Sequence, residues 1–247
     1  MIERRMQIIN DFSTNERISV AELAEKYHVS QVTIRNDLKA LQNENLLKRV
    51  HGGASSTSNE FISARLNVNY EIKLRIAERA AQMVNSGETI LIESGSTNAL
   101  LAKKLSETKD VTIITNSCFI ANFIREVPRV NIVLLGGNYQ PSSEVCVGPL
   151  TCQSLQSFFV DKLFIGTDGY SEKSGFTCVN LSRAEVVAAM AKRAEHSIIL
   201  TDSSKFSQRG VSQQLSLSEV SHVITDEGIP DAAREALKKN GVELITV

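Results

Sequence analysis

The stretch that decides the fold is residues 18–54, which read ISVAELAEKYHVSQVTIRNDLKALQNENLLKRVHGGA. Apolar residues recur at helical spacing on both sides of a short interruption at His28, Val29 and Ser30. The pattern predicts a short helix, a tight turn, and a second helix that begins at a capping serine and runs to about Gln42. The strand LLKRV and the two glycines after it predict a small basic β-hairpin.

The second of these helices carries its apolar residues at Ile34, Leu38 and Leu41. This spacing puts them on one face, where they form the core of a small domain. Residues on or beside the opposite face are of types that bind base edges and phosphates in the major groove of DNA. These candidates are Gln31, Val32, Thr33, Arg35, Asn36 and Lys39.

The chemistry of these side chains matches what DNA offers. An arginine binds the two acceptors of guanine, an asparagine binds adenine, and a valine contacts the methyl group of thymine. On the hairpin, Lys48, Arg49 and His51 are placed to meet phosphates or the minor groove. We therefore predict a helix that reads the major groove with a wing beside it. A small helical bundle with an ordinary solvated face is the alternative interpretation.

The composition of the whole chain narrows the class of protein. A formal net charge of −1 and a pI near 6.5 give no overall attraction to nucleic acid, so any DNA-binding charge must be local. The four cysteines form no CxxC pair and the four histidines are far apart, which indicates reduced thiols and no metal site. We expect a cytoplasmic protein without signal peptide or membrane span, since charges interrupt every apolar run.

Two domains are predicted from the 247-residue length and from a change of pattern near Tyr70. Residues 1–57 form the DNA-binding domain, with a first helix marked by Ile2, Met6, Ile9 and Phe12. Residues 58–69 are polar and aperiodic and are assigned as a linker. From residue 70 to 247, short apolar strands alternate with amphipathic helices, which predicts a mostly parallel α/β sheet. This second domain is the candidate for sensing an effector and for oligomerisation.

Seven strands and five helices are expected after the helix that begins the second domain. The strands are 88–93, 111–115, 131–135, 161–165, 197–201, 222–225 and 242–247. The helices are 98–105, 117–126, 149–158, 182–194 and 230–240.

Polar turns follow five of these strands, and in a parallel sheet such turns gather at one edge. The first turn opens a helix with small hydroxyl residues, so its backbone N–H groups are free to bind a phosphate, which Lys205 would help to neutralise. Glu93, Asp168 and Asn116 suit sugar hydroxyls. Ordinary capping turns are the alternative. The candidate effector-binding residues are Glu93, Ser94, Gly95, Ser96, Thr97, Asn116, Gly136, Gly137, Asp168, Gly169 and Lys205.

The two groups of motifs together resemble one family. The pattern SxxTIRxDLxxLxxxxLLxRxHGGA, which runs from Ser30 to Ala54, resembles the N-terminal signature of DeoR-type bacterial transcriptional regulators. The motifs ESGSTN, ITNS, LLGG, FIGTDG and TDSSKF look like those of the sensor domain of that family. The chain departs from the family at Asn36, where many members have a second arginine, and at Glu93, where the motif often begins with Asp.

The resemblance implies a winged helix-turn-helix followed by a sensor domain similar in fold to ribose-5-phosphate isomerase. It further implies a repressor of a carbohydrate operon that binds double-stranded operator DNA and responds to a phosphorylated sugar, which is an effector and not a cofactor. We expect a homodimer or a higher homo-oligomer, because one wing and helix read only a short half-site. No catalytic residue is assigned.

The alternative is a sugar-phosphate isomerase with a DNA-binding appendage, for which Asp168, Glu93, Asp202 and Lys205 supply candidate groups. Against it, the glycine-rich lysine loop expected of ribose-5-phosphate isomerases is not evident, because Gly136 and Gly137 are followed by Asn-Tyr-Gln.

Overall fold

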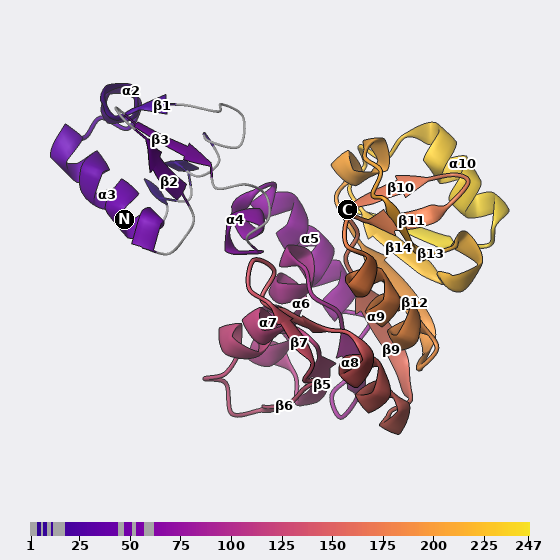
Figure 1. The fold of residues 1–247 in the computed structure, drawn as a ribbon. Coiled ribbons are helices and arrows are strands. Elements are labelled where there is room, and N and C mark those ends of the chain that lie inside the picture. Colours follow the sequence, from indigo (N-terminus) through magenta and orange to yellow (C-terminus); the bar gives the residue numbers. More distant parts are fainter. Residues whose placement is uncertain are drawn as a thin grey trace. The chain divides into compact units, whose positions relative to one another are not determined.

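The computed structural model describes residues 4–5, 7–8, 11, 18–43, 47–50, 53–56 and 62–247; for residues 42–43, 47–50, 53–56 and 63–64 it describes the backbone alone. The chain divides into two compact units, residues 1–70 and 71–247 (Figure 1). Within the described ranges, no helix is long and apolar enough to cross a membrane.

Two helices joined by a tight turn make up the middle of the first unit, as the sequence predicts. They are α2 (Val20–Lys26) and α3 (Gln31–Asn43). Ser19 starts α2 with a reciprocal cap: its hydroxyl accepts from the Glu22 N–H at 3.2 Å, and the Glu22 carboxylate accepts from the Ser19 N–H at 2.7 Å. His28 adopts a φ of +52°, and this left-handed residue turns the chain between the helices.

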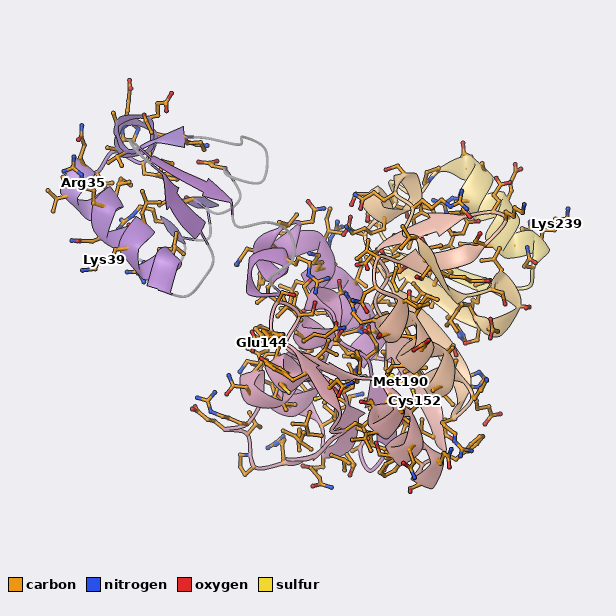
Figure 2. The ribbon with its side chains drawn as sticks, viewed as in Figure 1. Arg35, Lys39, Glu144, Cys152, Met190 and Lys239 are labelled. Atoms are coloured by element: carbon orange, nitrogen blue, oxygen red, sulfur yellow. The ribbon has the colours of Figure 1, made fainter. Side chains whose placement is uncertain are left out.

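The predicted core of this unit is confirmed. Ile34, Leu38 and Leu41 of α3 are buried in one cluster with Leu23 of α2 and with Ile8. The other side of α3 carries Arg35 and Lys39, which extend away from the cluster (Figure 2). Of the predicted first helix, the described residues 4–5, 7–8 and 11 are helical, whereas Ile2, Met6, Ile9 and Phe12 lie outside the described residues.

A three-stranded antiparallel sheet of order β1-β3-β2 completes the described part of this unit. The predicted hairpin is confirmed, because β2 (Leu47–Val50) pairs with β3 (Gly53–Ser56), and β3 also pairs with β1 (Ile18–Ser19).

Within the stretch predicted as a linker, residues 62–67 form helix α4 (Ile62–Asn67). Ile62 and Leu66 are four positions apart, which gives this mostly polar segment one apolar side. The predicted boundaries at residues 57 and 69 stay predictions.

The second unit is built on a sheet that has seven strands in the described residues, with the order β15-β14-β12-β9-β4-β5-β6. All of its ladders are parallel, so the predicted parallel α/β architecture is confirmed. The strands are β4 (Thr89–Ile92), β5 (Val111–Thr115), β6 (Val130–Leu134), β9 (Val160–Ile165), β12 (Ala194–Leu200), β14 (His222–Thr225) and β15 (Glu243–Thr246).

The order of the strands reverses once along the chain. From β4 the chain moves outward through β5 to β6, then returns to β9 on the other side of β4 and moves outward again through β12, β14 and β15. In open α/β sheets, ligands bind outside the carboxyl ends of the strands at such a reversal. The segments that follow β4 and β9 are therefore the place to look for a site.

The helices of this unit match the predicted ones with small shifts at their ends. The last predicted residues of α9 belong instead to a loop and to β12, which begins at Ala194. The helices are α5 (Tyr70–Ala81), α6 (Ser96–Thr108), α7 (Cys118–Phe123), α8 (Pro149–Ser154), α9 (Leu181–Ala191) and α10 (Asp231–Lys239).

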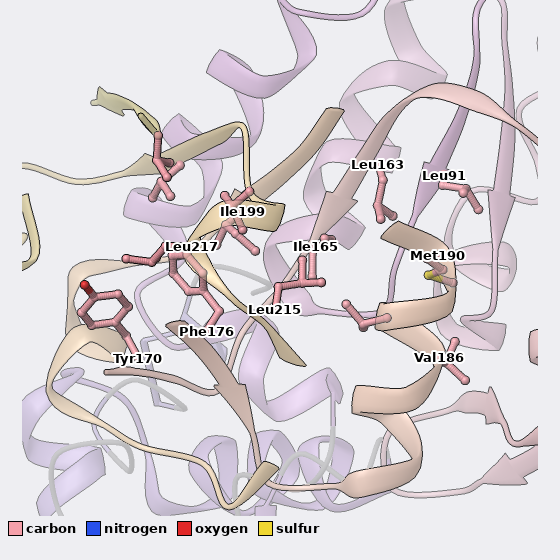
Figure 3. Packing of buried hydrophobic residues seen from close by; sticks show 14 of the residues in the cluster. Leu91, Leu163, Ile165, Tyr170, Phe176, Val186, Met190, Ile199, Leu215 and Leu217 are labelled. Carbon is pink, nitrogen blue, oxygen red and sulfur yellow. The ribbon is translucent and has the colours of Figure 1, made fainter. Parts of the chain in front are cut away.

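Sequence analysis missed a small antiparallel sheet of order β10-β11-β13, formed by β10 (Gly169–Ser171), β11 (Gly175–Cys178) and β13 (Ser212–Leu215). It also missed the hairpin of β7 (Asn138–Gln140) and β8 (Val145–Val147). These strands have only three or four residues, many of them polar or glycine, so no strand period stands out in the sequence. The aromatic residues of the small sheet lie in the same hydrophobic cluster as Leu91, Leu163 and Ile165 of the large sheet (Figure 3).

Candidate functional site

The outer face of α3 is the candidate DNA-binding surface. Of the six candidates on this helix, Gln31, Val32, Arg35, Asn36 and Lys39 are exposed and Thr33 is half-buried. Val32 is 61% exposed, so its side chain is accessible for a contact with a thymine methyl group.

Two local contacts order the start of this surface. The Ser30 hydroxyl accepts from the Thr33 N–H at 3.1 Å, which caps α3 as predicted. One turn further, Arg35 Nη2 donates to Gln31 Oε1 at 3.3 Å, so these two candidates are held beside each other. For the wing, the backbone of β2 is present, whereas the side chains of Lys48 and Arg49 and the whole of His51 lie outside the described residues.

A buried carboxylate on the inner side of α3 was not singled out from the sequence. The side chain of Asp37 is 3% exposed and accepts from Arg4 Nε at 2.7 Å and from Arg5 Nε at 2.9 Å. Burial raises the pKa of Asp37, but the two guanidinium groups outweigh it and hold that pKa below its ordinary value. Asp37 thus ties the recognition helix to the residues near the chain start.

We expect Asp37→Asn to destabilise the first unit by about 1–3 kcal/mol at neutral pH, since one of the two hydrogen bonds from arginine is lost and the other no longer has a charged acceptor. A carboxyl group whose pKa is lower in the folded state stabilises above its unfolded pKa of about 3.9. That contribution disappears as the pH falls through the lower folded value. Thermal unfolding of the two proteins at pH 7 and at pH 2.5 measures this, and the difference between them should shrink in acid. An equal difference at both pH values would contradict the ion-pair explanation.

In the second unit, the carboxyl ends of β4 and β9 bring the predicted acidic residues together. Glu93 directly follows β4 and is 1% exposed, and Asp168 lies in the segment after β9. The Arg183 guanidinium, from the first turn of α9, lies 3.8 Å from Glu93 Oε1 and 3.9 Å from Asp168 Oδ2. Glu93 also accepts from the Ser94 hydroxyl at 2.7 Å and from the Gly166 N–H at 3.3 Å.

The electrostatics of this group follow from its burial. Removal from water raises the pKa of the Glu93 carboxyl, and the positive charge of Arg183 opposes that rise. Burial disfavours the charged form of Arg183, but Glu93 and Asp168 outweigh it and keep the pKa of the guanidinium above its ordinary value. The group is therefore one cation held by two acidic side chains at the point where the strand order reverses.

Helix α6 starts at the same place and presents its N-terminus there. Its N-cap is Gly95, which within the described residues makes no side-chain cap, so the N–H groups of the first turn are not capped in this way. The helix dipole and these N–H groups favour an anion. Ser94, Ser96 and Thr97 are buried beside this end, and their role in effector binding stays a prediction.

Asn116 and Lys205 follow the two strands that flank this pair. Asn116, after β5, is buried and donates from Nδ2 to the Cys146 carbonyl at 2.9 Å. Lys205 lies in the 3-10 turn Ser203–Ser207 after β12, and its ammonium donates to the neutral Gln208 Oε1 at 3.1 Å. Four neighbouring strands thus contribute candidates to one edge, and at about 4.8 Å per strand they span about 14 Å.

The three other predicted glycines have packing contacts of their own. A Cβ atom on Gly137 would lie 2.0 Å from Thr151 Oγ1 and 2.7 Å from the Val147 carbonyl oxygen, and the Gly136 carbonyl accepts from the Thr151 hydroxyl at 2.7 Å. A Cβ atom on Gly169 would lie 2.5 Å from the Gln208 carbonyl oxygen. Close backbone approach accounts for Gly137 and Gly169, and a role in effector binding stays a prediction for all three.

Several buried polar atoms near this edge have no hydrogen-bond partner in the described part of the chain. Buried polar groups are normally bonded, so such atoms mark places where a ligand or water would bind. Sequence analysis missed Gln214, which lies in β13 and donates from Nε2 to the Gly166 carbonyl at 2.9 Å. The atoms are Asn98 Oδ1, Asn116 Oδ1, Arg183 Nε and Gln214 Oε1.

Comparison with known families matches both units. Residues 4–60 match the DeoR-like helix-turn-helix domain, and residues 68–227 match the DeoR C terminal sensor domain. The chain belongs to the DeoR family. Its α3 is therefore the second helix of a DeoR-type helix-turn-helix, and the edge formed after β4, β5, β9 and β12 lies in a DeoR-type sensor domain.

DeoR-type relatives align with nearly the whole chain. The putative aga operon transcriptional repressor of Escherichia coli O157:H7 is 33% identical over 99% of this chain and 93% of its own length. The transcriptional repressor GlcR of Bacillus subtilis (strain 168) is 32% identical over 98% of this chain and 95% of its own. The chain is thus a DNA-binding transcriptional regulator.

Among solved structures, ribose 5-phosphate isomerase A from Methanocaldococcus jannaschii is similar over 56% of this chain and 55% of that chain, at 22% identity and a TM-score of 0.42.

Proposed function

We propose that this DeoR-family regulator is a repressor of a carbohydrate operon and that a phosphorylated sugar controls its binding to operator DNA. The observation that carries the proposal is that, among the described residues, an α6 N-terminus without a side-chain cap meets buried, incompletely bonded polar groups where the strand order reverses. The α6 N-terminus and Lys205 suit a phosphate, whereas Glu93, Asp168 and Asn116 suit the hydroxyls of a sugar.

Control of DNA binding requires that the sugar phosphate bind the DNA-competent and the incompetent arrangement with different affinity. A typical coupling of 1–3 kcal/mol corresponds to a change of roughly 5- to 150-fold in operator affinity. We further propose a homodimer or larger assembly, because two recognition helices are needed to read two half-sites.

The experiment that tests the proposal is release of operator DNA by sugar phosphates, with Lys205→Ala as the variant. The DNA is a duplex selected by the wild-type protein from random sequences, and the probes are glucose 6-phosphate, fructose 6-phosphate and ribose 5-phosphate. We expect Lys205→Ala to bind this duplex normally and to need at least tenfold more of the effective sugar phosphate, since a charged contact to the phosphate is lost.

The control is Lys239→Ala, which removes an exposed lysine in the last turn of α10 (Figure 2). It should leave both DNA binding and release unchanged. Undiminished release from Lys205→Ala would refute the phosphate site, and a wild-type protein that none of the probes affects would refute the choice of effector class.

The isomerase alternative is separated by a direct assay. Isomerisation needs a free carboxylate base beside the first two carbons of the sugar. Asp168 instead accepts from the Val179 N–H at 3.1 Å and faces Arg183, and Glu93 is held by Ser94. We therefore propose a regulator without catalytic activity, and turnover of ribose 5-phosphate that Asp168→Ala abolishes would refute this.

A further inference from the structure

Arg183 is a buried cation in an unfavourable place. It is 7% exposed and lies in the first turn of α9, where Asn180 caps the helix by accepting from the Arg183 N–H at 3.1 Å. The N-terminal end of a helix carries partial positive charge, which disfavours a cation there. Arg183 is thus not placed there to stabilise α9. Its position is explained by the two acidic side chains that its guanidinium faces, Glu93 and Asp168.

The hydrogen-bonding capacity of this guanidinium is incompletely used. Its distances to Glu93 Oε1 and Asp168 Oδ2, 3.8 Å and 3.9 Å, exceed the range of a hydrogen bond. Its Nε is buried and, among the described residues, has no hydrogen-bond partner. An arginine has five N–H donors, and each buried donor left unbonded costs free energy.

The Glu93 carboxylate beside Arg183 is held in a fixed orientation and can still accept further hydrogen bonds. Glu93 Oε1 accepts from Ser94 and Oε2 from the Gly166 N–H, and an ionised carboxylate can accept about four hydrogen bonds. Gln214 donates to the carbonyl of the same Gly166, while its buried Oε1 has no partner among the described residues. Glu93 and Gln214 thus both bond to Gly166, Arg183 faces Glu93, and each of the three side chains has hydrogen-bonding capacity left over.

A sugar hydroxyl complements this arrangement because it donates one hydrogen bond and accepts others. Next to Arg183, it can donate to a carboxylate and accept from the guanidinium. Glu93 and Asp168 would repel a phosphate next to Arg183, whereas the N–H groups of the first turn of α6 and the Lys205 ammonium attract one, so we assign the phosphate to these two positive groups. Two neighbouring hydroxyls match one cation flanked by two carboxylates.

We infer that Arg183 is a specificity-determining residue of the sensor domain, which with Glu93 and Asp168 binds adjacent hydroxyls of the phosphorylated sugar. The inference rests on the proposed function and adds which end of the effector is recognised by which side chains. It implies that the effector is a polyhydroxylated phosphate ester and that affinity depends on its hydroxyls as well as on its phosphate.

The test compares a sugar phosphate with a phosphate ester that has no hydroxyls. Binding of glucose 6-phosphate, fructose 6-phosphate, ribose 5-phosphate and ethyl phosphate to the full chain is measured by calorimetry and by thermal stabilisation. The variants are Arg183→Met and Arg183→Lys. The control is Glu185→Gln, which changes an exposed charge on the same helix.

We expect Arg183→Met to reduce the preference for the best sugar phosphate over ethyl phosphate by about 10- to 100-fold, as for loss of hydrogen bonds to a charged group. Affinity for ethyl phosphate should stay unchanged. Arg183→Lys should lie between this variant and the wild type, because an ammonium lacks the planar set of donors. Glu185→Gln should equal the wild type.

Arg183→Met leaves the Glu93 carboxylate buried without its cation, which destabilises the fold. The double variant Glu93→Gln/Arg183→Met removes both charges and is therefore measured beside it. An unchanged preference in either folded variant would overturn the inference and leave the proposed function intact. A parallel loss of affinity for ethyl phosphate would also overturn the inference, because Arg183 would then bind the phosphate group. If the wild type binds none of the four probes, the proposed function itself fails and the inference with it.

Discussion

Replacing Arg35 with alanine is expected to lower the affinity for selected operator DNA by roughly 5- to 150-fold, the effect of losing one bidentate contact to guanine. Arg35 is exposed on α3, and Gln31 Oε1 accepts from its guanidinium. This hydrogen bond restricts the Arg35 side chain in the protein without DNA. Affinity is measured at one fixed salt concentration, because phosphate contacts make it depend on salt.

Two further variants show whether Arg35 reads a base or a phosphate. Arg35→Lys keeps the charge but loses the planar pair of donors, so it should recover non-specific binding and not specificity. Arg125→Ala removes an exposed arginine of the sensor unit and should change neither the affinity for operator DNA nor the affinity for unrelated DNA. An equal loss of affinity for operator and for unrelated duplexes in Arg35→Ala would contradict base reading. Stabilisation by a sugar phosphate should persist in every one of these variants.

Replacing Gly210 with alanine is expected to destabilise the sensor unit by about 3 kcal/mol. A Cβ atom there would lie 2.4 Å from the carbonyl carbon and oxygen of Cys178 in β11. Backbone cannot rotate away as a side chain can, so β11 and the segment before β13 would have to separate. In a unit of this size the loss corresponds to a fall in Tm of about 6–12 °C.

Gly136→Ala is the matched control, because neither glycine has a left-handed φ and a Cβ atom on Gly136 meets no described atom within 4 Å. It should change Tm by no more than about 2 °C. Scanning calorimetry without ligand measures both variants. A Gly210→Ala protein as stable as the control would mean that the contact between β11 and the Gly210 segment is not close in solution.

The sequence was sufficient to predict those helices and strands whose apolar residues follow one regular pattern. The spacing of Ile34, Leu38 and Leu41 fixed the core face of α3, and the structure buries all three. The apolar strands of the large sheet were likewise found, because a parallel strand covered on both faces is apolar along its length. From such strands it follows that polar turns share an edge, and the turns after β4 and β9 do meet there.

Other features depend on contacts between distant segments and have no local pattern. The strands of the small sheet are too short and too polar to show a period of two, so Gly169 was assigned to a turn although it begins β10. The sequence is compatible with two roles for Arg183, an effector contact or a surface charge at a helix start, and only the fold shows that Glu93 faces it.

The reversal of strand order between β4 and β9 has a consequence for how binding preference can be altered. Because the proposed effector site is assembled from turns far apart in the chain, residues 93–98, 166–169, 183 and 202–207, we expect that no single exchanged segment transplants the preference of one relative into another. The turns that contact one another at Glu93, Gly166 and Arg183 must instead be exchanged together, while the strands beneath them and the recognition helix α3 keep their sequences.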